Sequence, residues 1–249
     1  FPMEKGEYGR RISELEKSMD FQLDLLQKQA VEEALTKGVV VVTGGPGTGK
    51  TTTINLMIRC FEMEKMDIVL AAPTGRAAKR MTEATGYEAK TIHRLLEVSG
   101  GIEDGDSSHF EKNEDNPIEA DAVILDEMSM VDIHLMYSLL KAIVPGTRLI
   151  LVGDSNQLPS VGPGNVLKDI IDSKAFSVVR LSKIYRQAES SHIVLNAHKI
   201  NAGELITLDN KNKDFFFFEK KDVRSVMGAL VYLVKTRLPE YIGASPFEI

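Results

Sequence analysis

The feature that most constrains the fold is a run of β-branched residues that ends in a glycine-rich turn and continues into a lysine and three threonines, VVVVTGGPGTGKTTT (Val39 to Thr53). A continuous valine run is typical of a strand covered on both faces, because a strand with one solvated face alternates apolar and polar residues. Glycines let successive backbone N–H groups point at one anion, and a helix starting at Lys50 adds the positive end of its dipole. The stretch therefore predicts a strand, a phosphate-binding turn and a helix.

The turn matches the pattern Gly44-x-x-x-x-Gly49-Lys50-Thr51, the Walker A motif. In this pattern the lysine reaches the β- and γ-phosphates of a nucleotide, and the threonine hydroxyl binds Mg²⁺. The alternative is a glycine-rich connection that binds nothing, but the strand and helix signals lie on the correct sides of the turn. ATP and Mg²⁺ are the expected cofactors. The candidate nucleotide-binding residues of this stretch are Gly45, Pro46, Gly47, Thr48, Gly49, Lys50, Thr51 and Thr52.

A second stretch, AVILDEMSMVD, places Asp126 and Glu127 at the end of an apolar strand. Ligands of open parallel sheets bind at the carboxyl ends of the strands, so this pair is expected beside the phosphate-binding turn. Asp126 would hold Mg²⁺, and Glu127 would orient and deprotonate the attacking water. Alone, such a pair is usually a solvated helix start. Together with a Walker A motif it indicates hydrolysis of a Mg-nucleotide.

Apolar runs of strand length alternate with segments of helix length over most of the chain. This alternation predicts an α/β fold of the P-loop NTPase type, with a mostly parallel sheet and helices on both faces. The expected strands cover residues 39–43, 68–72, 122–126, 148–152 and 178–181, and the expected helices cover residues 25–37, 50 onward, 76–84 and 133–143.

Two segments depart from this alternation. Residues 100–117 are glycine-rich and acidic, and they predict an exposed loop or β-hairpin inserted at about 99–118. The run DFFFFE (Asp214 to Glu219) predicts a strand and residues 222–237 a helix, which together are too little to form a packed unit. The expected division is therefore the tail of an upstream region (1–20), an ATPase domain (21–182) and the truncated start of a second domain (183–249).

Composition narrows the class of protein. Cys60 is the single cysteine, which excludes an intramolecular disulfide framework and a cysteine-cluster zinc site. The apolar runs are too short to span a bilayer and no signal peptide opens the sequence, so we expect a cytoplasmic protein without a membrane partner. The net charge of -6 does not exclude nucleic acid, because binding depends on the local placement of Lys and Arg.

Two further motifs follow predicted strands. GDSNQLPSVGPG sets Asp154 and Gln157 at a strand end, where Gln157 could contact the γ-phosphate; the alternative is a polar loop. LSKIYRQ offers the ring of Tyr185 for a base and the guanidinium of Arg186 for transition-state charge. Taken alone, the last two residues would more often pack on the surface.

The stretches APTGRAAKRM and TIHRLL each combine a hydroxyl with basic side chains at the start of a predicted helix. Since the Walker A turn already holds the nucleotide, these sites suit a different phosphate, such as the backbone of single-stranded DNA. A lone histidine such as His93 is more often structural. The candidate DNA-binding residues are Pro73, Thr74, Gly75, Arg76, Thr91, His93 and Arg94.

In this order, these motifs resemble the RecD/TraA branch of superfamily 1 (1B) DNA helicases from about Leu23 to Glu204, and weakly beyond. The resemblance implies a RecA-like first motor domain and an enzyme that couples hydrolysis of Mg-ATP to 5′-to-3′ movement on single-stranded DNA or a junction. It implies work in recombination or repair, with other helicase or nuclease subunits as candidate partners. LDLLQKQAV resembles the Q motif of the family, so Gln27 is expected to read adenine, with Gln29 the less favoured register.

The resemblance also assigns roles. It implies that Gln157 couples the γ-phosphate to DNA, that Tyr185 stacks on adenine, that Arg186 is an arginine finger, and that the acidic insertion takes the place of a strand-splitting pin. The late motifs of the family, T-x-H-x-x-Q/K-G and T-R-A/G-R, are not found after Gly203. We therefore expect this chain alone to bind nucleotide, hydrolyse it poorly and not unwind DNA.

Three alternatives stay open on the sequence. The first is a superfamily 1 RNA helicase, because no residue reports a 2′-hydroxyl unambiguously. The second is a nucleotide-gated DNA-binding module that moves nothing, although such a switch has no need of the base that Glu127 offers. The third is the motor part of a relaxase-linked conjugation protein.

Overall fold

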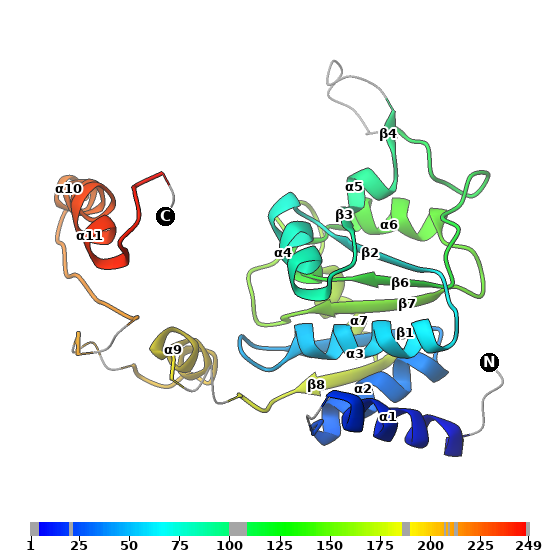
Figure 1. Ribbon diagram of the computed structural model, residues 1–249. Coiled ribbons are helices and arrows are strands. Elements are labelled where there is room, and N and C mark those ends of the chain that lie inside the picture. Colours follow the sequence, from blue (N-terminus) through cyan, green and yellow to red (C-terminus); the bar gives the residue numbers. More distant parts are fainter. Residues whose placement is uncertain are drawn as a thin grey trace.

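The protein is described by a computed structural model (Figure 1), which covers residues 5–19, 22–99, 109–185, 190–206, 208, 210–211 and 214–247. Six parallel strands form one sheet in the order β3-β2-β6-β7-β1-β8. The strands are β1 Val39–Gly44, β2 Ile68–Ala72, β3 Ala89–Thr91, β6 Ala122–Leu125, β7 Arg148–Gly153 and β8 Ser177–Leu181. The predicted fold class is confirmed.

Helices follow the strands as the alternation predicted, and most start at a side-chain cap. Asp24 caps α2 in a capping box that Gln27 completes, and Thr74 and Asp132 cap α4 and α6. The helices are α1 Lys5–Met19, α2 Leu25–Thr36, α3 Lys50–Met63, α4 Gly75–Thr85, α5 Ile92–Leu95, α6 Ile133–Ala142, α7 Val166–Ser173, α9 His192–Asn201, α10 Val223–Tyr232 and α11 Leu238–Ile242, with a 3₁₀ turn η1 Met128–Met130 and a π-helical turn η2 Leu233–Arg237.

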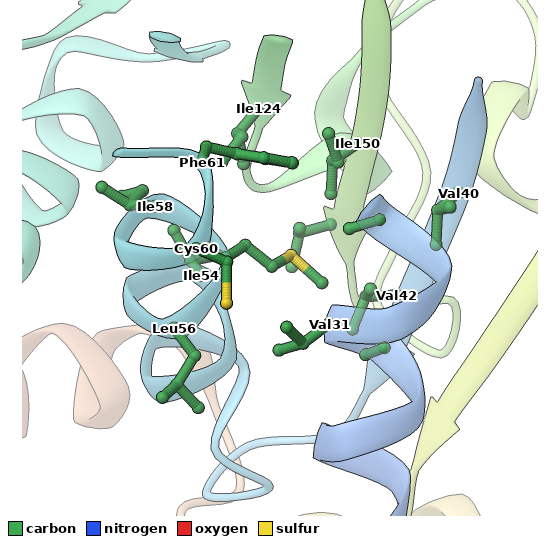
Figure 2. Packing of buried hydrophobic residues seen from close by; sticks show 14 of the residues in the cluster. Val31, Val40, Val42, Ile54, Leu56, Ile58, Cys60, Phe61, Ile124 and Ile150 are labelled. Atoms are coloured by element: carbon green, nitrogen blue, oxygen red, sulfur yellow. The ribbon is translucent and has the colours of Figure 1, made fainter. Parts of the chain in front are cut away.

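The sheet separates two hydrophobic clusters, as the alternation of side chains along β1 illustrates. Val40 and Val42 pack in the cluster made with α1, α2, α3 and α4, whereas Val41 packs in the cluster made with α5, α6 and α7. Figure 2 shows the first cluster, where Phe61 and Ile54 of α3 and Val31 of α2 lie against side chains of the strands. Both faces of the sheet are therefore buried, which is why the strands read as continuous apolar runs.

The N-terminal segment is more regular than the sequence suggested. We expected a charged and only partly helical lead-in, yet α1 forms over fifteen residues and buries Ile12 and Leu15 in the first cluster. Two apolar residues on one face are enough to attach the helix because α2 and α3 supply the rest of the contact.

The strand predicted at Asp214–Glu219 is wrong. No strand forms in the described residues from 214 to 220, although the helix that follows does form as α10. The side-chain amide of Asn210 accepts from the backbone N–H of Phe217 at 2.6 Å and donates to the carbonyl oxygen of Phe217 at 2.8 Å. A side chain thus occupies backbone groups that a neighbouring strand would pair.

In the region of the predicted insertion (99–118), β4 Val98–Ser99 pairs antiparallel with β5 His109–Phe110, and the described residues from 111 to 117 form no strand. Residues 100–108 of the predicted insertion lie outside the described residues. Among the helices that the structure describes, none is both long and apolar enough to cross a membrane.

Candidate nucleotide-binding site

The motifs meet at the carboxyl ends of the strands, because all strands of the sheet run parallel. β1 ends at Gly44, β6 at Leu125 and β7 at Gly153, and each strand end leads directly into one of the polar motifs. A hydrogen bond between the hydroxyls of Thr43 and Ser155, 3.2 Å long, joins the ends of β1 and β7. The topology therefore places the Walker A turn between the acidic pair and the segment after β8.

The phosphate-binding turn (Gly44–Thr51) has the conformation that its glycines permit. Gly47 and Gly49 adopt positive φ values of 74° and 82°. The ammonium of Lys50 donates to the carbonyl oxygens of Gly44 at 2.6 Å and Gly45 at 3.1 Å, and the buried hydroxyl of Thr48 donates to Gly45 at 2.8 Å. An ammonium has three donors, so a phosphate oxygen can join these two carbonyls as a third acceptor.

One cavity of about 1010 Å³ brings the two halves of the site together. Its wall includes Thr51 from α3, Asp126 and Glu127 from the end of β6, and Gln157 from the loop after β7. Thr74, Arg76 and Arg80 from the N-terminal half of α4 line the same cavity. The carboxylates thus lie on the same side of the sheet as the phosphate-binding turn.

Thr52 occupies a different place from Thr51. It lines a neighbouring groove of about 770 Å³ between α3 and α4, together with Asn55 and Arg59. Successive residues of a helix point about 100° apart, so Thr51 and Thr52 cannot face the same ligand atom.

Asp126 is an acid in an environment that disfavours its charge. Its pKa is raised to about 6, mainly by burial and also by the negative charge of Glu127, while the backbone N–H of Glu127 and the ammonium of Lys50 act in the opposite direction. That N–H donates to Oδ1 of Asp126 at 2.8 Å. Glu127 itself has φ 56°, a left-handed backbone that is strained for a non-glycine residue and turns its side chain into the cavity.

Gln157 and Asp154 lie in the loop after β7. The hydroxyl of Ser129 donates to Oε1 of Gln157 at 3.4 Å, which ties this loop to the 3₁₀ turn after the acidic pair. Asp154 is buried, and its Oδ1 accepts the backbone N–H of Asn156, so it shapes the loop that carries Gln157.

Gln27 and Tyr185 lie together beside the turn although 158 positions separate them. The phenol of Tyr185 donates to Oε1 of Gln27 at 2.6 Å, and the same oxygen accepts the backbone N–H of Asp24. A Cβ on Gly49 would lie 2.8 Å from Nε2 of Gln27 and 2.9 Å from Cε2 of Tyr185. The pair therefore closes one side of the turn. Arg186, the predicted arginine finger, lies outside the described residues.

The predicted DNA-binding residues divide between two places. Thr74 and Thr91 cap α4 and α5 through their hydroxyls, which accept from the backbone N–H groups of Ala77 at 3.2 Å and Arg94 at 3.1 Å. Pro73 precedes Thr74 between β2 and α4, and Gly75 is the first residue of α4. Arg76 is exposed at the mouth of the cavity that contains the acidic pair.

The second group lies on α5, at the end of the edge strand β3. His93 and Arg94 are exposed, and the ring of His93 contacts that of Phe110 with centroids 6.0 Å apart. This contact ties α5 to the inserted hairpin.

Sequence reasoning missed His198. This residue of α9 lies against the phosphate-binding turn, with Nε2 3.0 Å from the carbonyl oxygen of Pro46. A single histidine in an amphipathic helix has no local signal that distinguishes it from a surface residue.

Comparisons with known proteins agree with this arrangement. A family model described as AAA domain matches residues 27–163. An ATP-dependent RecD2 DNA helicase of Deinococcus radiodurans is 39% identical over 178 residues, which are 72% of this chain and 24% of that protein. A RecBCD enzyme subunit RecD of Mycobacterium tuberculosis is 41% identical in an alignment of 189 residues that covers 67% of this chain and 31% of that protein. The chain thus spans about a quarter to a third of the length of these relatives.

Two solved structures share the fold. The Pif1 protein of Bacteroides sp. in complex with ADP-AlF4 has a TM-score of 0.50 at 23% identity, and the match covers 76% of this chain and 48% of that one. The Pif1 helicase of Candida albicans has a TM-score of 0.53 at 20% identity, covering 75% of this chain and 45% of that one.

Proposed function

The chain belongs to the AAA domain family, whose model spans residues 27–163, and from this premise we propose that it is the ATP-hydrolysing first motor domain of a superfamily 1 DNA helicase. The observation that carries the proposal is the single cavity that Thr51, Asp126, Glu127 and Gln157 share. The similarity to RecD and RecD2 proteins supports DNA as the track, since the names of those relatives describe a DNA helicase and a RecBCD subunit.

The residues present fit a magnesium ion. In the described part of the chain no group of three or more His, Cys, Asp or Glu side chains is arranged to hold a metal alone. Mg²⁺ at a nucleotide site needs only one or two protein oxygens, because phosphates and water supply the rest. Thr51 and Asp126 offer such oxygens on one cavity, and the raised pKa of Asp126 reflects a buried charge with little compensation. When bound there, the ion would neutralise phosphate charge.

Two residues of the cavity, Glu127 and Gln157, act in hydrolysis together with Lys50 of the turn and with Arg186. Lys50 binds the β- and γ-phosphates, and Glu127 orients the attacking water and accepts its proton. Gln157 contacts the γ-phosphate and communicates its loss through Ser129. Arg186 supplies positive charge to the transition state.

Base recognition rests on Gln27 and Tyr185. The side-chain amide of Gln27 is 1% exposed, and its oxygen already accepts two hydrogen bonds. The amide nitrogen donates to the carbonyl oxygen of Gly49 at 3.5 Å, and its second N–H is the donor for an adenine acceptor, while the Tyr185 ring stacks on the base. The first helical turns after Pro73 and Thr91 hold single-stranded DNA, and movement is 5′-to-3′, with the inserted hairpin splitting strands.

The domain division of residues 1–20, 21–182 and 183–249 stays part of this proposal, as do a place in recombination or repair and association with helicase or nuclease subunits. This chain alone binds Mg-ATP but turns it over slowly and does not unwind DNA, since the late motifs that would complete a second motor domain are not in its sequence.

The decisive experiment replaces Glu127 by Gln in a protein that carries the remaining motifs. Binding of Mg-ATP should persist and DNA-stimulated hydrolysis should fall by at least about a hundredfold, because the general base is lost. Unchanged turnover would favour a nucleotide-gated binding module that performs no work.

Stronger stimulation by RNA than by DNA oligomers would favour an RNA helicase. The binding constant for single-stranded DNA should fall by about 0.7 log units per phosphate contact for each tenfold increase in salt concentration.

A further inference from the structure

Four consecutive carbonyl groups of the phosphate-binding turn are held, two from within the turn and two from outside it. Lys50 binds those of Gly44 and Gly45, as described above. The next two are held by the segment that follows β8. Nε2 of His198 lies 3.0 Å from the carbonyl oxygen of Pro46, and the backbone N–H of Tyr185 donates to the carbonyl oxygen of Gly47 at 3.2 Å.

The direction of the His198 bond follows from its chemistry. A carbonyl oxygen can only accept a hydrogen bond, so Nε2 of His198 carries a hydrogen and is the donor. Both the neutral Nε2–H tautomer and the imidazolium can make this bond.

These bonds set the direction of the amides that face a phosphate. In a trans peptide the C=O and the following N–H point in opposite directions from one rigid plane. Fixing the carbonyl of Pro46 toward His198 therefore turns the N–H of Gly47 to the opposite side, and the bond from Tyr185 does the same for the N–H of Thr48. A nest for anions requires such inward-facing amides.

The fit between α9 and the turn is close. A Cβ built on Gly45 would lie 2.6 Å from Cε1 of His198, well inside van der Waals contact. The imidazole of His198 thus occupies the space that a side chain at position 45 would take, and the glycine is needed here for close approach rather than for a positive φ, which it does not have.

We propose that His198 is a positioning residue for nucleotide binding: its Nε2–H fixes the Pro46–Gly47 peptide so that the turn is prepared for the phosphates. This inference rests on the proposed nucleotide site and deepens it, because it makes α9, in the segment after β8, part of the phosphate-binding apparatus. Movement of α9 away from the turn would release the Pro46–Gly47 peptide and weaken phosphate binding.

The test compares substitutions that separate the hydrogen bond from packing. His198→Phe keeps a ring without a donor, and His198→Gln keeps a donor without the ring. His134→Phe makes the same chemical change at an exposed position on α6 and serves as the control. Thermal unfolding of each protein establishes that it is folded.

The first measurement uses the nucleotide-free protein and follows hydrogen exchange of the amides from Gly44 to Thr51. Exchange should become about fivefold faster in His198→Phe, the factor expected when one net hydrogen bond is lost, and return toward the parental rate in His198→Gln. Equal exchange in the parent and His198→Phe would overturn the role of His198, whatever the nucleotide does.

The second measurement is the affinity for Mg-ATP, Mg-ADP and adenosine. His198→Phe should bind both phosphorylated ligands about fivefold more weakly and adenosine as the parent does, because only the phosphate cradle changes. An equal loss for adenosine would overturn the inference in favour of general disruption. Failure of the parent to bind Mg-ATP would instead contradict the proposed function, and the exchange experiment would still decide the contact.

Discussion

Replacing Asp126 by Asn should stabilise the protein in the absence of divalent cations and nucleotide. Asparagine keeps an Oδ1 that can accept the backbone N–H of Glu127, and it removes a negative charge from a buried position next to a second carboxylate. The group proposed to bind metal is thus also a source of instability, as expected where charge is placed for function rather than for folding.

The size of the effect follows from linkage. The pKa of Asp126 is about 6 in the folded protein, against about 3.9 in an unfolded chain. Two units at about 1.36 kcal/mol each give close to 3 kcal/mol, and because the carboxylate is partly exposed we expect about 1–3 kcal/mol. A folded pKa above the unfolded one means that folding takes up a proton between about pH 4 and pH 6. The loss of folding stability caused by the charged Asp126 is therefore absent below about pH 4, grows across this window and is complete above about pH 6.

Urea unfolding with a chelator, repeated from pH 4.5 to pH 8, measures this difference. Asp126→Asn should exceed the parent by about 1–3 kcal/mol at pH 7.5, or roughly 2–10 °C in Tm, and the two should converge toward pH 4.5. Asp169→Asn, at an exposed position of α7, should change stability by less than about 0.5 kcal/mol. An Asn variant that is no more stable at pH 7.5, or an advantage that persists unchanged at low pH, would refute the reasoning.

Of three further predictions, two concern the surroundings of the turn and one concerns the buried core. Gly49→Ala should lose about 1–3 kcal/mol in urea unfolding, because φ is 82° and the added carbon meets Gln27 and Tyr185, whereas Gly38→Ala, with no atom within 4 Å, should stay near the parent. Tyr185→Phe should keep stacking but release the amide of Gln27, so competition binding should show reduced preference for ATP over GTP; an unchanged ratio would argue against adenine reading by this pair. The thiol of Cys60 is 1% exposed and burial raises its pKa to about 12, so a thiol reagent at pH 8 should label it only after unfolding, and rapid labelling of the native protein would contradict this.

The parts of the fold that were predictable are those fixed by local pattern and by parallel topology. Continuous valine and isoleucine runs identified the central strands because both faces of the sheet are covered. Once the strands are parallel, residues that follow different strands must meet at one edge. The amino-acid sequence alone therefore sufficed to place the acidic pair beside the Walker A turn.

Other features depend on tertiary contacts that no local pattern reports. Four consecutive phenylalanines favour a strand by propensity, yet Asn210 takes the backbone groups of Phe217. Family resemblance implied that Gln27 and Tyr185 both contact adenine, but neither the bond between them nor the contact of His198 with Pro46 was expected. In each case the partner lies far along the chain or in a side chain whose direction is set by packing.

The resting place of the Lys50 ammonium has a consequence for selectivity. Because the ammonium already donates to the oxygens of Gly44 and Gly45, it keeps one of its three donors for an incoming anion. A lone inorganic phosphate from buffer brings few contacts beyond the ammonium, whereas a polyphosphate tail can engage the amides and the lysine together. We therefore expect the turn to bind a polyphosphate tail more tightly than a lone phosphate.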